Sequence, residues 1–130
     1  MTSTLIASEE FPSLYAAAYA FYEAGDYEKA VEMFTALTQS APFEINHWKG
    51  LASAQQMRPD YEAALHAWSI ASLLNEQDPW VHFHAAECML SLDKQHEAAK
   101  ALVMAEARID PALHEGLRDK IELLKTIHMS

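Results

Sequence analysis

Apolar residues recur along this chain with the spacing of amphipathic helices, and the whole pattern repeats. Two sets of small residues return every 34 positions, one at Ala18, Ala52 and Ala86 and the other at Ala30, Ala64 and Ala98. A large apolar residue follows each member of the second set by four positions, on the same helical face, at Phe34, Trp68 and Leu102. Small residues at a fixed interval are expected where two helices approach closely. The pattern therefore predicts one helix pair repeated along the chain.

Helix start and stop signals divide the pattern into elements. Gly25 supplies a left-handed stop, Pro42 cannot continue a helix, and Asp78 followed by Pro79 is a strong start signal. The predicted helices are 11–24, 27–40, 45–57, 61–74, 79–92, 95–108 and 112–128. One face of the last helix is expected to carry Leu113, Leu117, Ile121, Leu124 and Ile127. The chain reads as seven helices and no strand.

A period of 34 residues is typical of tetratricopeptide repeats, which are stacked helix-turn-helix units. The predicted fold is all-α: three such repeats form a short right-handed superhelix, an α-solenoid, with a C-terminal capping helix. The expected divisions are a mobile N-terminal arm at 1–10, repeats at 11–44, 45–78 and 79–111, and the capping helix at 112–130. A capping helix is needed because the last repeat would otherwise expose its core.

The first predicted helix has more apolar residues than one buried stripe requires. Tyr15, Tyr19 and Tyr22 fall on a face next to the stripe that packs on the paired helix. Rings that carry hydroxyl groups suit a wet binding wall better than a dry interior, where each hydroxyl needs a partner. With the 34-residue register, the predicted peptide-binding groove comprises Tyr15, Ala16, Tyr19, Tyr22, Asn46, Lys49, Gly50, Ser53, Gln56, Met57, Trp80, Phe83, His84 and Glu87.

Composition narrows the function classes. The 130 residues suffice for one domain, and 51% of them are hydrophobic. Nineteen acidic against nine basic residues give a net charge of −10, which repels phosphate backbones and anionic lipid. We therefore expect neither nucleic-acid binding nor membrane insertion. The first ten residues lack a signal peptide, and the single cysteine, Cys88, fits a reducing compartment, so a cytoplasmic protein is expected.

The candidate chemical groups have structural interpretations. His84, Glu87 and Cys88 share a helical face, but a structural zinc site needs a fourth ligand and usually more cysteine. A buried small cysteine is also a simpler interpretation of Cys88 than a nucleophile paired with His84. With three glycines in the chain there is no glycine-rich phosphate loop. We expect no catalytic residue, no metal and no cofactor, and so no enzyme.

Three segments resemble a known family. They are LYAAAYAFYEAGDYE at 14–28, GLASAQQ at 50–56 and FHAAECML at 83–90, of which the last is the most specific. They are similar to the class II chaperones of bacterial type III secretion, the low-calcium-response H and SycD type. The resemblance covers about 14–102. It implies a cytosolic protein of three repeats that holds hydrophobic, pore-forming translocators before secretion.

The resemblance also implies how the cargo binds. An extended cargo segment with spaced apolar anchors would lie in the concave groove, where Tyr15, Tyr19, Tyr22 and Phe83 match groove aromatics. Relatives have a longer stretch before the first repeat, linked to self-association, whereas only about ten residues precede Phe11 here. Monomer and homodimer therefore both stay open.

Two other functions are compatible with the same fold. One is a chaperone that wraps the helical needle subunit of the secretion system, which the motif containing His84, Glu87 and Cys88 argues against. The other is a general peptide-binding scaffold or co-chaperone that grips a C-terminal carboxylate. That mode needs several cationic and amide side chains on the inner face, and Asn46 with Lys49 are too few.

Overall fold

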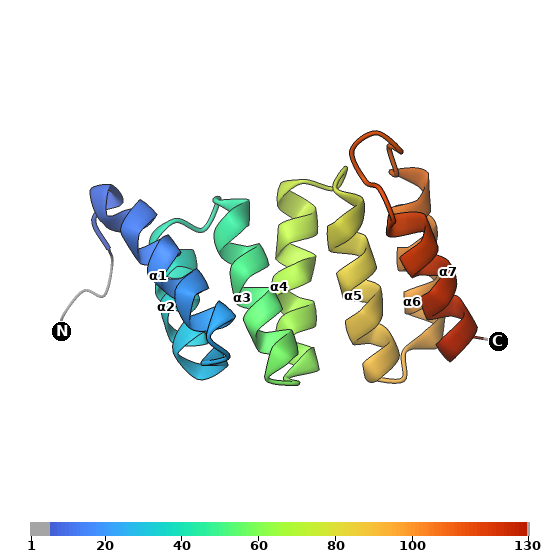
Figure 1. The fold of residues 1–130 in the computed structure, drawn as a ribbon, viewed down its shortest axis with the longest axis horizontal. Helices are drawn as coiled ribbons and strands as arrows, with labels where there is room; N and C mark the ends of the chain where they lie inside the picture. The colour runs from blue at the N-terminus through green and yellow to red at the C-terminus, as the bar shows by residue number, and fades with distance from the viewer. Residues whose placement is uncertain (1–5, 130) are drawn as a thin grey trace.

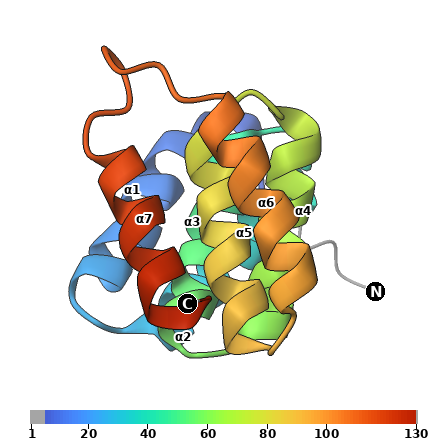
Figure 2. The same ribbon diagram turned by 90° about the vertical axis from the view of Figure 1, so that its right-hand side faces the viewer.

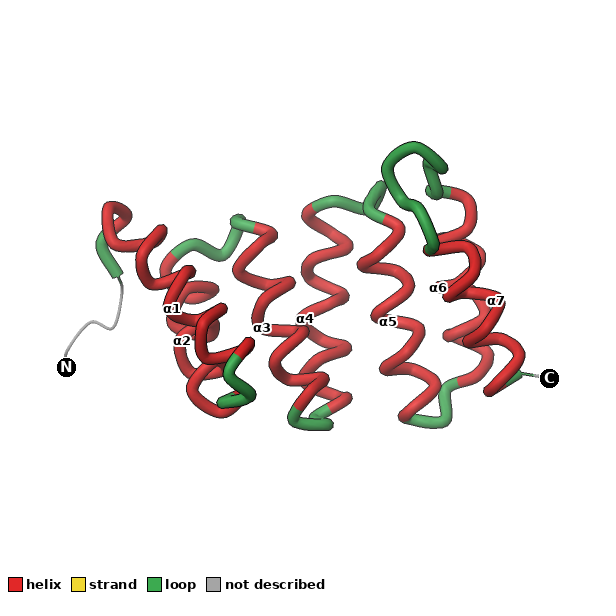
Figure 3. Tube along the Cα trace, viewed as in Figure 1, coloured by secondary structure: helices red, strands yellow, loops and turns green. Residues whose placement is uncertain are grey.

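The computed structural model describes residues 6–129. These residues form seven α-helices and no strand (Figures 1 and 3). The helices are α1 (Phe11–Glu23), α2 (Tyr27–Ser40), α3 (Ile45–Met57), α4 (Tyr61–Leu74), α5 (Pro79–Ser91), α6 (Gln95–Ala107) and α7 (Leu117–His128). The prediction of an all-α repeat fold is confirmed. No helix in the described range is both long and apolar enough to cross a membrane.

Aspartate caps explain why several helices begin where they do. The side chains of Asp26, Asp60 and Asp78 accept hydrogen bonds from the amides of Lys29, Ala63 and Trp80 at 3.2, 3.4 and 2.9 Å. Each bond satisfies a backbone donor that the first helical turn leaves without an intrahelical partner.

Successive helix pairs lie side by side along the molecule (Figure 1). The repeated alanines Ala18, Ala30, Ala52, Ala64, Ala86 and Ala98 are all fully buried, as their 34-residue register predicts. Buried side chains form two clusters, one spanning α1 to α5 and the other joining α5, α6 and α7. In the end-on view α7 lies on the side of α1, with α4 and α6 on the opposite side (Figure 2).

The C-terminal helix differs from the prediction. Residues 111–116 form turns and a bend, and α7 begins at Leu117 rather than at residue 112. Asp110 caps only a local turn, its carboxylate accepting from the Ala112 amide at 2.9 Å, and Gly116 then adopts a left-handed φ of 82°. Of the five residues expected on one face, Leu117 and Ile121 are fully buried, whereas Leu113, which precedes α7, and Ile127 are exposed.

The N-terminal arm is only partly described, because residues 1–5 lie outside the range. Ser8–Glu10 form a 3₁₀ turn that leads into α1. The amide of Ile6 donates to the hydroxyl oxygen of Ser40 at 2.8 Å, and Ile6 packs against the first cluster. The described part of the arm therefore lies against the C-terminal end of α2.

Candidate functional site

A ladder of aromatic rings, Tyr15, Tyr19 and Tyr22, runs along α1. Neighbouring rings meet edge to face, with centroids 5.0 Å apart for Tyr15 and Tyr19 and 6.1 Å apart for Tyr19 and Tyr22. Tyr15 and Tyr19 also contact the buried ring of Phe34 at 6.0 and 5.3 Å. All three tyrosines are half-buried. Each ring therefore has one part anchored on the core and another available for contact.

Partial burial changes the acidity of this ladder. Burial is the main cause that raises the pKa of the Tyr15 phenol, and the neighbouring Tyr19 adds to the increase. Burial likewise raises the pKa of Tyr22, with a smaller contribution from Tyr27. Both phenols consequently stay neutral hydrogen-bond donors at physiological pH.

The middle repeat contributes polar side chains that are mostly engaged. The Lys49 ammonium pairs with Asp78 at 2.8 Å, and the Ser53 hydroxyl donates to the Lys49 carbonyl at 2.8 Å. Asn46 is exposed at the start of α3, where its backbone N–H donates to the Glu44 carboxylate. Because Lys49 is held by Asp78, it is a poor receptor for a peptide carboxylate.

A network that we call the polar relay links three helices. The Trp68 indole donates to the Gln56 side-chain oxygen at 3.0 Å, and the Gln56 amide donates to the Glu87 carboxylate at 3.1 Å. The same carboxylate oxygen lies 2.7 Å from Nδ1 of His84. The His84 ring stacks on Trp68 at 4.9 Å and on Trp80 at 6.0 Å. The relay thus fixes Gln56, His84 and Glu87 in place between repeats two and three.

The sequence missed the part that Trp68 plays here. Its position after Ala64 predicts a core residue, and the side chain is indeed only 3% exposed. A buried indole N–H nevertheless requires a partner, and it finds one in the side-chain oxygen of Gln56. The sequence could have indicated this contact, because a buried Trp68 needs a hydrogen-bond acceptor and Gln56 lies on the paired helix of the same repeat.

The aromatic residues of the third repeat surround a pocket of about 240 Å³ between α5 and α7, the α5–α7 pocket. Trp80, His84 and Glu87 are half-buried, as a groove wall requires. Phe83 is only 5% exposed, because it also joins the cluster that holds α6 and α7. Leu123 and Ile127 of α7 line the opposite side, which the sequence did not predict.

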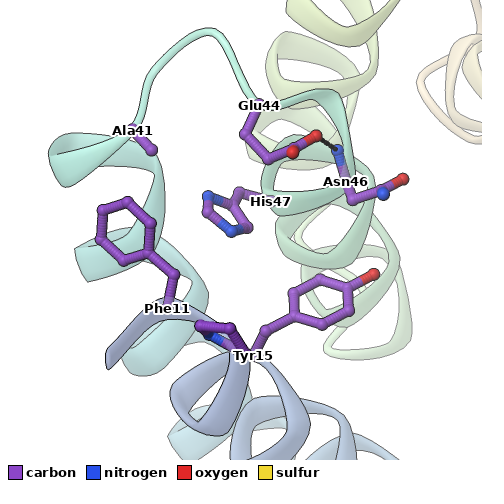
Figure 4. Close-up of a pocket in the computed structure, with 7 residues that line it drawn as sticks. Phe11, Tyr15, Ala41, Glu44, Asn46 and His47 are labelled. Carbon is purple, nitrogen blue, oxygen red and sulfur yellow. Dashed lines mark hydrogen bonds between the residues drawn. The ribbon is translucent and has the colours of Figure 1, made fainter. Parts of the chain in front are cut away.

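A second pocket, of about 370 Å³, lies between α1 and α3 (Figure 4). The rings of Phe11 and Tyr15 come from α1, and that of His47 from α3; both α1 rings are within 6 Å of His47, at 5.8 and 5.7 Å between centroids. Tyr15 and Asn46 were predicted for the groove, whereas Phe11 and His47 were not. His47 is 4% exposed, and only its place after Asn46 in the first turn of α3 could have indicated it.

Three small or flexible predicted positions have different outcomes. Ala16 of α1 and Met57, the last residue of α3, are both exposed. Gly50 is buried, and a Cβ atom there would lie 2.3 Å from the ring of Phe34. Its burial does not support the assignment to an open groove wall, since Gly50 lies where α3 packs against Phe34 of α2.

The Cys88 side chain is fully buried, so reagents in solution cannot reach its thiol in the folded protein. Burial raises the pKa of its thiol to about 12, and the nearby Glu87 carboxylate adds to the increase. Within residues 6–129, no group of three or more His, Cys, Asp or Glu side chains is placed to hold a metal ion.

We expect native Cys88 to resist alkylation because the reactive species is the thiolate. Iodoacetamide at about pH 8 should leave the folded protein unlabelled for hours and label the guanidinium-unfolded chain within minutes. Intact-mass spectrometry gives the readout. Rapid labelling of the folded protein would contradict the burial of this thiol.

Comparison with known proteins agrees with this geometry. Tetratricopeptide repeat family models match residues 13–43 and 45–78. Low calcium response locus protein H of Yersinia pestis is 32% identical over 104 residues, which are 80% of this chain and 62% of that protein. The chain thus spans less than two thirds of the length of that relative.

Solved structures extend the similarity over nearly the whole chain. PcrH in complex with the chaperone binding region of PopB has a TM-score of 0.84 and 30% identity, covering 92% of this chain and 97% of PcrH. The Yersinia enterocolitica type III secretion chaperone SycD, in complex with a peptide of the translocator YopD, has a TM-score of 0.81 and 26% identity, covering 95% and 92%.

The helical fold and the two family matches define a tetratricopeptide-repeat protein. The 30% identity to PcrH, over 97% of the PcrH chain, shows the family. The chain belongs to the LcrH/SycD-type family of class II type III secretion chaperones.

Proposed function

We propose that this protein is a cytosolic chaperone that binds an extended, apolar segment of a type III secretion translocator along the face of α1, α3 and α5. The tyrosine ladder carries the proposal, because Tyr15 and Tyr19 are anchored on Phe34 and all three rings remain half-exposed. PcrH and SycD, each bound to a translocator segment, support the choice of cargo. The proposed role is binding, without catalysis.

The chemistry of the face suits such a guest. Aromatic rings at both ends bury apolar anchors at about 25 cal/mol per Å² of apolar area. Between them the face is polar, since the relay and Ser53 are held by hydrogen bonds within the protein. A segment held this way is kept from aggregating without being folded, so it can be released. The net charge of −10 adds solubility to the loaded complex.

We expect Tyr19→Asp to weaken binding of a translocator segment at least about 30-fold, the loss typical of a hot-spot residue worth about 2 kcal/mol. The charge would replace a ring that the guest contacts. Fluorescence polarisation with two labelled probes, the chaperone binding region of PopB and the YopD peptide, measures the dissociation constants.

Two further variants serve as controls for this measurement. Ser13→Asp places the same charge at an exposed position of α1 outside the ladder and should bind normally. Tyr22→Ala removes a ring without adding charge, and it covers the case in which Tyr19→Asp unfolds because Tyr19 packs on Phe34. Wild-type affinity in both folded tyrosine variants would refute the groove.

A further inference from the structure

The C-terminal helix exposes apolar side chains that face the groove. Leu123 and Ile127 are 60% and 63% exposed, although α7 buries Leu117 and Ile121 completely. Both exposed side chains line the α5–α7 pocket together with Trp80, Phe83, His84 and Glu87. A helix that only capped the last repeat would direct its polar side to solvent here. The exposed pair therefore requires another explanation.

The pocket is continuous with the groove. Its α5 wall is made of side chains that also belong to the polar relay or stack on it, since His84 bonds Glu87 and stacks on Trp80. A peptide that follows the tyrosine ladder and the relay reaches this pocket at the third repeat. Continuity with the proposed binding face indicates a segment of the same guest as the occupant.

The lining also defines the chemistry of the occupant. Trp80 and Phe83 meet at 90° with their centroids 6.1 Å apart, leaving an aromatic corner opposite two aliphatic side chains. Nδ1 of His84 and Oε1 of Glu87 are bonded to each other, and the Gln56 amide donates to the same oxygen. Lys120 stands at the α7 rim and has no ion pair within residues 6–129. An uncharged aliphatic side chain with a neutral or acidic neighbour complements this lining.

We propose that α7 is a wall of the binding groove, and that a branched aliphatic anchor of the translocator segment inserts between Trp80 and Phe83 on α5 and Leu123 and Ile127 on α7. The inference rests on the proposed function, which it extends from the three repeats to the C-terminal helix. It makes Leu123 and Ile127 contact residues for the cargo.

Single substitutions on α7 test the wall directly. Leu123→Asp and Ile127→Asp should each weaken binding of the PopB region or the YopD peptide about tenfold or more, a change of about 1.4 kcal/mol. Leu113→Asp is the matched control, because Leu113 is 74% exposed in the same C-terminal segment and does not line the pocket. Circular dichroism and melting temperature should be unchanged in all three, since the replaced side chains are exposed. Wild-type affinity in both folded α7 variants overturns the proposal.

The comparison with Tyr19→Asp separates the two levels of the argument. If Tyr19→Asp loses binding and the α7 variants do not, the groove stands and α7 is only a cap. If the wild-type protein binds neither probe, both the proposed function and the wall fail.

A double-mutant cycle locates the anchor. Each aliphatic residue of the bound probe is replaced by alanine and measured against the wild-type protein and Leu123→Ala. A contact predicts that one probe position loses much less affinity in Leu123→Ala than in wild type, whereas distant positions add independently. Additivity at every position overturns the proposed contact.

A second copy of this chain is the competing occupant. Sedimentation equilibrium of the wild-type protein and Leu123→Asp, without probe, distinguishes it. We expect the same oligomeric state for both. A wild-type dimer that Leu123→Asp converts to monomer would assign the exposed pair to self-association and overturn the proposal.

Discussion

Ala64→Glu is expected to abolish the folded state at physiological temperature. Ala64 is fully buried in α4, within the cluster that spans α1 to α5. A glutamate there adds several atoms to a close-packed crossing, which typically costs about 1–3 kcal/mol. It also buries a charge with no partner, which adds several kcal/mol more. Together these costs approach the total stability of about 5–15 kcal/mol that a domain has.

Thermal unfolding followed by circular dichroism measures the effect. The variant should be insoluble or lack a cooperative transition above about 25 °C. His66→Glu supplies the control, because it adds the same side chain at an exposed position of the same helix. A soluble Ala64→Glu protein that melts within a few degrees of wild type would contradict the repeat register itself.

The repeat register was readable because its determinants are local. The bounds of α2 (Tyr27–Ser40) and α4 (Tyr61–Leu74) match the predicted ranges. An aspartate cap begins each helix, and the 34-residue period sets its length. The start of α7 was not readable. Asp110 and Pro111 are typical of a helix start, but the left-handed turn at Gly116 breaks the helical path before it can continue.

The site could be predicted only in part from the sequence, because residues that line a groove and residues that pack against another helix occupy the same helical face. The register places Tyr15, Lys49 and Phe83 at equivalent positions, yet Lys49 is tied to Asp78 and Phe83 is buried by α7. The position of α7 comes from tertiary packing, since this helix falls outside the 34-residue period. Its exposed residues Leu123 and Ile127 therefore could not be assigned to the groove from sequence.

Gly50 shows the same ambiguity at its sharpest, because a glycine on a groove wall and a glycine at a helix crossing look alike in sequence. Three ring carbons of Phe34 lie 2.3, 2.5 and 2.7 Å from where its Cβ would be. Carbon atoms in contact normally stay about 3.5–4.0 Å apart. Phe34 is fully buried, so its ring has no open space into which it can turn.

We expect Gly50→Val to destabilise the protein by about 3 kcal/mol, at the upper end of the range for overpacking a core. Relief of the helix-breaking tendency of glycine offsets only a few tenths of a kcal/mol, because valine is itself a poor helix former. Denaturant unfolding gives the free energy. Ala16→Val is the matched control: Ala16 occupies the equivalent register position one repeat earlier, is exposed, and should change stability by less than about 0.5 kcal/mol.

A second substitution shows whether the cost comes from the Phe34 ring. Phe34→Leu shortens the side chain and alone should destabilise by about 1–2 kcal/mol through the space it leaves. Combined with Gly50→Val, it vacates the volume that the new methyl groups need, so the double variant should be more stable than the sum of the two single losses predicts, by about 1 kcal/mol or more. Strict additivity would mean that Gly50 and Phe34 do not touch, and would return Gly50 to the groove wall.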